Sequence, residues 1–198
     1  GTPRTHAGVS PGERGEVCAD AQEAAALAVV NAARAAAGAA PFSCHQILHS
    51  MAMDHAEFLA RNEELARTAP HAEQEGSPGF TGGTLAARAD AHGLGRDGLR
   101  LAENVGSSTN VAAELAAQLA TVYHRSPLLA PGGRFFAYAE ASATRHHIVL
   151  HTLAAASPSA PVVFPADGAV AVPVTFNADG ERPDPLPDLR HPGYPISA

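Results

Sequence analysis

The chain has 198 residues, 45% of them hydrophobic, which suffices for one domain with a full core and a small extension. Its 13 basic residues, all arginine, and 20 acidic ones give a net charge of −7, and no arginine run suited to phosphates occurs, so a nucleic-acid partner is not expected. No stretch approaches about 18 continuous apolar residues, so no transmembrane segment is predicted.

Two helices are predicted after a Gly- and Pro-rich linker at residues 1–17, which has neither an initiator Met nor a signal peptide and is expected in a mature or trimmed product. Residues 20–37 carry Leu27 and Val30 at helical spacing and end at Gly38. A second helix is predicted over residues 44–66, with an apolar stripe formed by Leu48, Met51, Ala52, His55, Phe58 and Leu59.

Cys18 and Cys44, the only two cysteines, each precede one of these helices. A disulfide between them would join the two helix starts and stabilise the fold by roughly 3 kcal/mol. Two buried thiols are the alternative. A Cys-x-x-Cys metal or redox motif is absent from the sequence.

Three histidines fall on the second predicted helix. His55 lies on the apolar stripe, which favours a hydrogen-bonded histidine of the core. His45 and His49 are one turn apart and could share a metal ion, but no third ligand has a known position, so a capping or solvated role is favoured.

The middle of the chain alternates loops and short elements. Residues 70–100 are loop-rich, with a short helix at residues 84–92. A helix beginning near Asn110 is predicted to run to Tyr123, which would place His124 at its C-terminal end, where the helix dipole favours a protonated imidazole. Two strands, residues 134–143 and 147–153, are predicted to form an antiparallel hairpin, with a turn around residues 144–145.

The composition changes after Leu153. Residues 154–161 form a linker rich in Ala, Ser and Pro, and strand-like runs at residues 162–164 and 169–176 follow, interrupted by proline. Such spacing is typical of a small β-rich extension, here residues 158–198, whose expected role is structural packing. Whether this extension is truncated at residue 198 stays open.

Three short motifs contain the candidate site residues. His71 opens His71-Ala-Glu-Gln-Glu-Gly76, Glu103 lies in Ala102-Glu103-Asn104-Val105, and His124 begins His124-Arg-Ser-Pro-Leu-Leu129. In this order they resemble the signature of the CAP superfamily, which includes cysteine-rich secretory proteins, insect venom antigens and plant pathogenesis-related proteins. The stretch Asn31-Ala-Ala-Arg34-Ala-Ala-Ala-Gly38 resembles the family's opening Asn-x-x-Arg-x-x-x-Gly.

The resemblance implies an α+β fold, an α-β-α sandwich over residues 18–157, in a secreted or cell-envelope bacterial protein. It also implies that His71, Glu103 and His124 converge in one cleft. The secretory character of the family favours the disulfide over free thiols. The family's second acidic residue is missing before His124, where residues 120–123 read Ala-Thr-Val-Tyr. Glu140 could supply a carboxylate, although a surface role is favoured for it.

Two imidazoles and one carboxylate suffice for an open Zn²⁺ site with water as the fourth ligand. No nucleophile elbow, His-Glu-x-x-His helix or phosphate-binding loop accompanies them. The leading interpretation is therefore a binding module whose cleft holds a small apolar or envelope-derived ligand, or a protein partner, and carries Zn²⁺ as a candidate cofactor. A metal-dependent hydrolase acting on peptides or cell-wall polymers is one alternative, and a purely structural envelope module is another.

Overall fold

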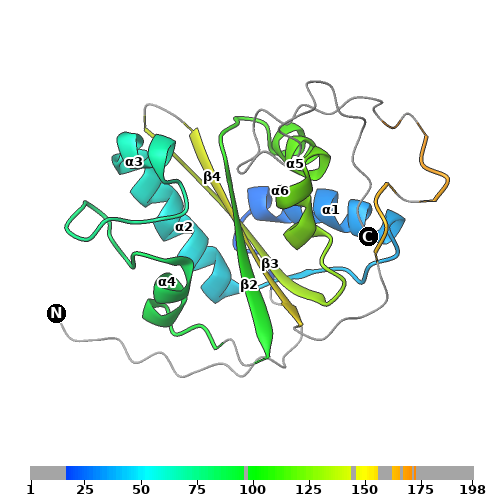
Figure 1. The fold of residues 1–198 in the computed structure, drawn as a ribbon, viewed down its shortest axis with the longest axis horizontal. Coiled ribbons are helices and arrows are strands. Elements are labelled where there is room, and N and C mark those ends of the chain that lie inside the picture. The colour runs from blue at the N-terminus through cyan, green and yellow to red at the C-terminus, as the bar shows by residue number, and fades with distance from the viewer. Residues whose placement is uncertain are drawn as a thin grey trace, which may run out of the picture.

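A four-stranded sheet forms the central layer of the computed structural model, which describes residues 17–95, 98–143, 146–155, 162–165, 167–170 and 172. The strand order is β1-β3-β4-β2, with bounds Ser43–Cys44 (β1), Leu99–Gly106 (β2), Gly133–Ser142 (β3) and His146–Ala155 (β4). On one side lie α2 (Gln46–Arg61), α3 (Glu63–Thr68) and α4 (Leu85–Ala91) (Figure 1). On the other lie α1 (Ala21–Ala36), α5 (Val111–Ala120) and α6 (Val122–Leu128), so the predicted α+β sandwich is confirmed.

Alternation along β3 builds a separate hydrophobic core on each face of the sheet. Phe135 and Ala137 pack against α2, whereas Phe136 and Tyr138 pack against α1 and α5. Successive side chains of a strand point to opposite faces, so a central strand covered on both sides is apolar throughout. β2 is different, because it lies at the edge of the sheet and is only half-buried along most of its length.

Two polar residues of α1, Asn31 and Arg34, hold the chain that leads from α1 to β1. The Asn31 side chain donates to Phe42 O and accepts from Phe42 N, at 3.0 and 2.8 Å. The buried Arg34 guanidinium donates to the carbonyls of Ala40, Leu128 and Ala130. Burial lowers the pKa of Arg34 to about 10, so it stays charged at neutral pH.

The predicted disulfide is present. Cys18 and Cys44 are bonded with a Cα–Cα distance of 5.1 Å, within the usual range. The bond joins the segment before α1 to β1.

Two predicted helices are each divided in two. The helix predicted over residues 44–66 breaks at Asn62, whose side chain donates to Phe58 O and Pro78 O, so α2 ends at Arg61 and α3 begins at Glu63. The helix predicted to run from Asn110 to Tyr123 ends at Ala120, because Thr121 is extended (φ −103°, ψ 147°). The predicted position of His124 at a helix C-terminus is therefore wrong, since His124 lies in the first turn of α6.

The predicted hairpin of β3 and β4 is confirmed, but its turn at residues 144–145 lies outside the described residues. Residues 1–16 and most of the predicted C-terminal extension also lie outside them. In the described part of the chain, no helix is both long and apolar enough to cross a membrane.

Candidate functional site

Adjacent residues of β2 face opposite layers of the sandwich. Glu103 pairs in register with His151 of β4 and points to the α2 side. Asn104 points to the other side, where its Nδ2 donates to Gln118 Oε1 at 2.9 Å and to His124 O at 2.8 Å. The Glu-Asn pair of the motif therefore fastens the edge strand to both helical layers.

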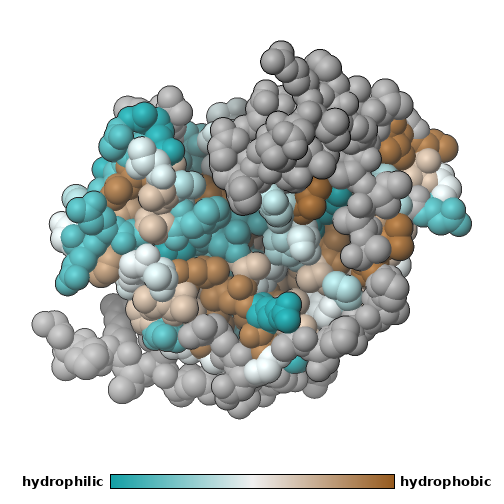
Figure 2. All heavy atoms as spheres, in the orientation of Figure 1, coloured by the Kyte–Doolittle hydropathy of each residue, from teal (hydrophilic) through white to brown (hydrophobic). Residues whose placement is uncertain are grey.

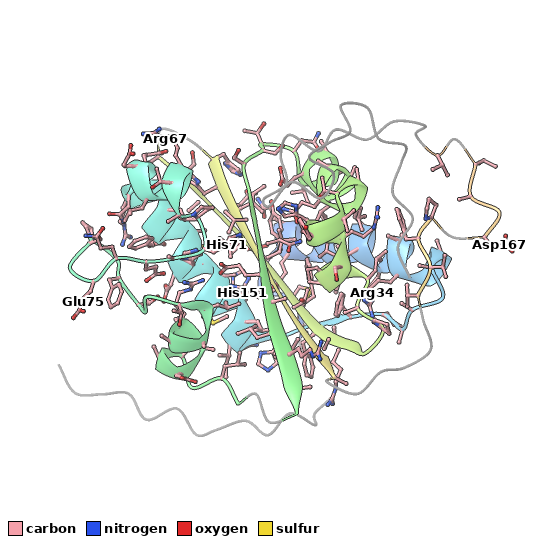
Figure 3. The ribbon with its side chains drawn as sticks, in the orientation of Figure 1. Arg34, Arg67, His71, Glu75, His151 and Asp167 are labelled. Carbon is pink, nitrogen blue, oxygen red and sulfur yellow. A yellow bond between two sulfur atoms is a disulfide. The ribbon has the colours of Figure 1, made fainter. Side chains whose placement is uncertain are left out.

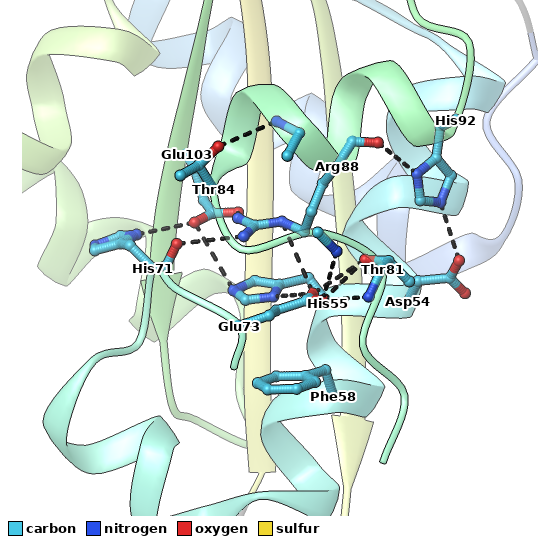
Figure 4. Close-up of polar contacts among 12 residues, drawn as sticks. Asp54, His55, Phe58, His71, Glu73, Thr81, Thr84, Arg88, His92 and Glu103 are labelled. Atoms are coloured by element: carbon cyan, nitrogen blue, oxygen red, sulfur yellow. Dashed lines mark hydrogen bonds and ion pairs between the residues drawn. The ribbon is translucent and has the colours of Figure 1, made fainter. Parts of the chain in front are cut away.

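The Glu103 carboxylate is fully engaged by basic side chains (Figure 4). Oε2 accepts hydrogen bonds from Arg88 Nη2 at 2.6 Å and His151 Nε2 at 2.8 Å. Oε1 accepts from His71 Nδ1 at 3.0 Å. The Glu103 side chain is only 2% exposed, so these contacts replace water around a buried charge.

A second buried carboxylate, Glu73, lies behind Glu103. It accepts hydrogen bonds from the main chain of Thr81 and Gly82 and contacts His55 Nδ1 at 2.9 Å. His55 Nε2 lies 2.9 Å from Pro70 O, so both of its nitrogens face oxygen acceptors. This agrees with the hydrogen-bonded core histidine predicted for His55, which is 0% exposed.

Two opposing effects set the pKa of Glu103. Burial alone would raise it, but hydrogen bonds from His151 and His71 outweigh burial and hold the pKa of Glu103 well below its ordinary value. Burial lowers the pKa of His151, whose Nε2 lies 2.8 Å from the Glu103 carboxylate and whose Nδ1 lies 3.3 Å from Leu48 O. The same two effects act on Glu73. Burial opposes its ionisation, but hydrogen bonds from His55 and from the Thr81 and Gly82 amides lower its pKa.

His71 is the exposed member of this network. Its side chain is 56% exposed, while Nδ1 donates to Glu103 and its carbonyl accepts from Arg88 Nη1 at 3.3 Å. Because Nδ1 carries the proton in this bond, Nε2 of the neutral ring has a lone pair and points away from Glu103. Figure 3 shows His71 and His151 beside the same stretch of β2.

His124 lies in the other helical layer, on α6. Its Nδ1 lies 2.9 Å from the Thr121 hydroxyl, and its carbonyl accepts the hydrogen bond from Asn104. The predicted effect of a helix C-terminus does not apply to His124, because His124 lies in the first turn of α6.

The three predicted ligands are only partly gathered. His71 and Glu103 are in direct contact, whereas His124 is linked to Glu103 through its neighbour Asn104. Among the described residues, the one group of three ligand atoms within 4.8 Å of one another is Cys18, Glu23 and Cys44, and its two sulfurs form the disulfide. Glu140 lies apart on the Tyr138 face of β3, where it accepts from the Tyr138 hydroxyl and contacts His146.

Three members of the network were not predicted as site residues: Arg88, His151 and Glu73. Arg88 and His151 are fully buried and Glu73 nearly so. One signal was present for His151, a histidine in the mostly apolar run of β4 at residues 148–153. His45 caps α2, one of the roles favoured for it, whereas His49 is neither capping nor solvated, because its Nδ1 lies 3.3 Å from Glu23 Oε1.

A cavity of about 280 Å³ lies beyond Glu103, near the C-terminal end of β2. Its wall consists of Ala66 and Arg67 from α3, Pro70, residues 105–107 and His147. Pro70 precedes His71 and Val105 lies on the same strand face as Glu103, so the cavity adjoins the His71–Glu103 pair.

The comparisons with known proteins agree with this architecture. A region of an extracellular SCP-domain protein from Bacillus anthracis matches 67% of this chain and 40% of that protein, with 16% identity and a TM-score of 0.51. An outer surface protein of Borrelia burgdorferi matches over 65% of this chain and 89% of its own, with 15% identity and a TM-score of 0.52. The chain thus spans less than half of the first protein, and at these identities the likeness shows the fold alone.

No curated protein sequence matches the chain. The model of the cysteine-rich secretory protein family, CAP, matches residues 27–149, which is more than half of the chain and contains His71, Glu103 and His124. The protein therefore belongs to the CAP family.

Proposed function

We propose that the protein is a secreted or cell-envelope binding module whose ligand site is the cleft around His71, Glu103 and His124. The structurally similar proteins are an extracellular protein and an outer surface protein, which supports this location. The Cys18–Cys44 disulfide adds independent support, because such bonds persist in oxidising compartments.

The observation that carries the proposal is the orientation of His71 by a saturated carboxylate. Both Glu103 oxygens are occupied, so Glu103 holds the His71 ring in one tautomer with Nε2 directed outward. A carboxylate behind a histidine is the usual outer partner of a metal-binding imidazole. We accordingly assign Glu103 to orienting His71 and His71 to meeting the ligand.

The same residues suit a divalent metal in part. His71 and His124 would hold the ion, with Glu103 as the outer partner of His71. When bound, Zn²⁺ would supply a Lewis acid that attracts an oxygen or nitrogen donor of the ligand. The chain's own contribution is the fixed His71 ring and the buried charge beneath it.

Binding is favoured over hydrolysis by the state of Glu103. A general base works best with a pKa near the operating pH and an oxygen within reach of its proton. The pKa of Glu103 lies far below neutrality, and each oxygen already accepts hydrogen bonds. A purely structural module would not require an exposed, oriented imidazole such as His71, which is 56% exposed.

Calorimetric titration with Zn²⁺ at neutral pH tests the proposal. The wild-type protein should bind one equivalent, and His71→Ala and His124→Ala should each weaken binding at least about tenfold. His146→Ala is the matched control, because His146 contacts Glu140 on the other face of the sheet and should leave affinity unchanged. Undetectable binding by the wild type, or equal affinity in His71→Ala, would contradict the metal site.

A further inference from the structure

The outer edge of β2 is open to another strand. All eight residues of β2 pair with β4 in unbroken antiparallel register, and the sheet order leaves the other side of β2 without a neighbouring strand. In an antiparallel strand, alternate residues direct both N–H and C=O away from the partner. Within the described ranges, no backbone hydrogen bond joins residues 99–106 to a segment other than β4.

Glu103 shows that solvent reaches this edge. Its side chain is 2% exposed, but the residue as a whole is only half-buried, so the exposed part is main chain. Natural edge strands are commonly protected by proline, lysine or a bulge. β2, Leu-Arg-Leu-Ala-Glu-Asn-Val-Gly, has none of these.

The cavity of about 280 Å³ lies where an added strand would place a side chain near the end of β2. It contains His147, whose side chain is 7% exposed and whose Nε2 is buried without a hydrogen-bond partner among the described residues. The same nitrogen forms an ion pair with Glu63 Oε2 at 3.5 Å, a contact that does not count as a hydrogen bond. A buried unpaired polar atom is costly, and a ligand hydroxyl or amide would satisfy it.

Charge and shape favour one kind of occupant. Exposed Arg100 near the start of β2 has no ion pair with a described residue, which suits an acidic side chain opposite it. The edge lies between the α2 and α6 layers (Figure 1), and Figure 2 shows both hydrophilic and hydrophobic residues along it. A second copy of the sandwich would bring its own helical layers against these walls, whereas a single extended segment is narrow enough to enter.

We propose that β2 accepts an extended peptide segment of a partner protein as an added strand, with one small polar side chain in the cavity beside His147 and an acidic residue facing Arg100. Main-chain hydrogen bonds would provide affinity, and the cavity would provide selectivity. This deepens the proposed binding function by naming its ligand class, but it does not depend on the metal.

The test uses phage-displayed random decapeptides, selected on the full chain in the presence of EDTA so that loss of zinc binding cannot affect the outcome. The tightest peptide is then synthesised and titrated by fluorescence anisotropy. N-methylation of alternate amides on one edge of this peptide should weaken binding at least about tenfold, because two or more hydrogen bonds are lost. Methylation of the intervening amides should have little effect, and hydrogen exchange should slow at alternate amides of β2.

Protein variants locate the peptide. Ala66→Leu, which narrows the cavity on a helix that tolerates leucine, should weaken binding at least about tenfold. Ala117→Leu, at an exposed position of α5, is the control and should bind like the wild type. Failure to enrich any peptide, tolerance of N-methylation on both edges, or protection outside β2 would each overturn the proposal.

Discussion

His71 Nδ1 and Glu103 Oε1, 32 residues apart in the chain, lie 3.0 Å apart across the rim of a buried charge network. The imidazole is 56% exposed and the carboxylate 2% exposed, so the pair connects solvent to the interior. The carboxylate that anchors the buried network therefore also orients His71, the residue that we propose meets the ligand.

Replacing Glu103 by Gln should destabilise the fold by about 3 kcal/mol, because the buried Arg88 loses its closer carboxylate at 2.6 Å and keeps only Glu73 at 3.9 Å. Urea denaturation measures the free energy of unfolding. Glu64→Gln is the matched control: Glu64 also pairs with an arginine, but its side chain is 71% exposed, so it should stay within about 0.5 kcal/mol of wild type. A loss under about 1 kcal/mol in Glu103→Gln would show that the network is not coupled to folding.

Acid should destabilise the protein through Glu103 and Glu73. Their folded pKa values lie below the ordinary value of 4.5, so the stabilisation they give is complete above about pH 4.5 and is lost as the pH falls toward the folded values. The free energy of unfolding should be steady near neutrality and fall steeply below about pH 4.5. Glu103→Gln should show a shallower fall, and an identical slope in both proteins would contradict the assignment.

Reduction of Cys18–Cys44 should lower the melting temperature. The bond closes a loop with a sequence separation of 26, which corresponds to about 3 kcal/mol in the chain-entropy model. Calorimetry with and without a phosphine reductant measures the shift. A Cys18→Ser/Cys44→Ser double variant should melt at the temperature of the reduced protein and ignore the reductant; a further shift in this variant would locate the effect elsewhere.

Gly133→Ala should cost about 2 kcal/mol of stability through overpacking. A Cβ at Gly133 would lie 2.5 Å from Arg34 Nη2 and from Phe42 Cε1, both held in place by the contacts of α1. Gly95→Ala provides the control, since a Cβ there meets nothing within 4 Å. Equal chemical denaturation midpoints for the two variants would argue that α1 yields to the added methyl group.

Local sequence patterns predicted the helices and strands that depend mainly on residues close together in the chain. The 3.6-residue spacing in α1 and the apolar runs of β3 and β4 identified these elements, whereas the disulfide was only permitted by the two cysteines and was favoured by the resemblance to the family. The break at Asn62 depends on Pro78, 16 residues away, and so has no local signal. β2 was not predicted, because its alternation of Leu99, Leu101 and Val105 is interrupted by Glu103, whose partners come from distant segments.

The site residues likewise divide into those that local motifs predict and those that depend on contacts between distant segments. His71 and Glu103 followed from their motifs, and the structure places them in contact. The convergence of His124 with both stays a prediction. Arg88 and His151 could not be assigned, because only the folded register brings them to one carboxylate.

Because Glu103 and Asn104 point to opposite faces of the sheet, β2 should tolerate neither insertions nor deletions. Inserting or deleting one residue in a strand moves every later side chain to the opposite face of the sheet. Such a change upstream of Glu103 would turn its carboxylate toward Gln118 and the Asn104 amide toward Arg88, so both layers would lose their anchor in one event. Insertions and deletions among related sequences should therefore occur in the turns at either end of β2, while the number of residues in the strand stays constant.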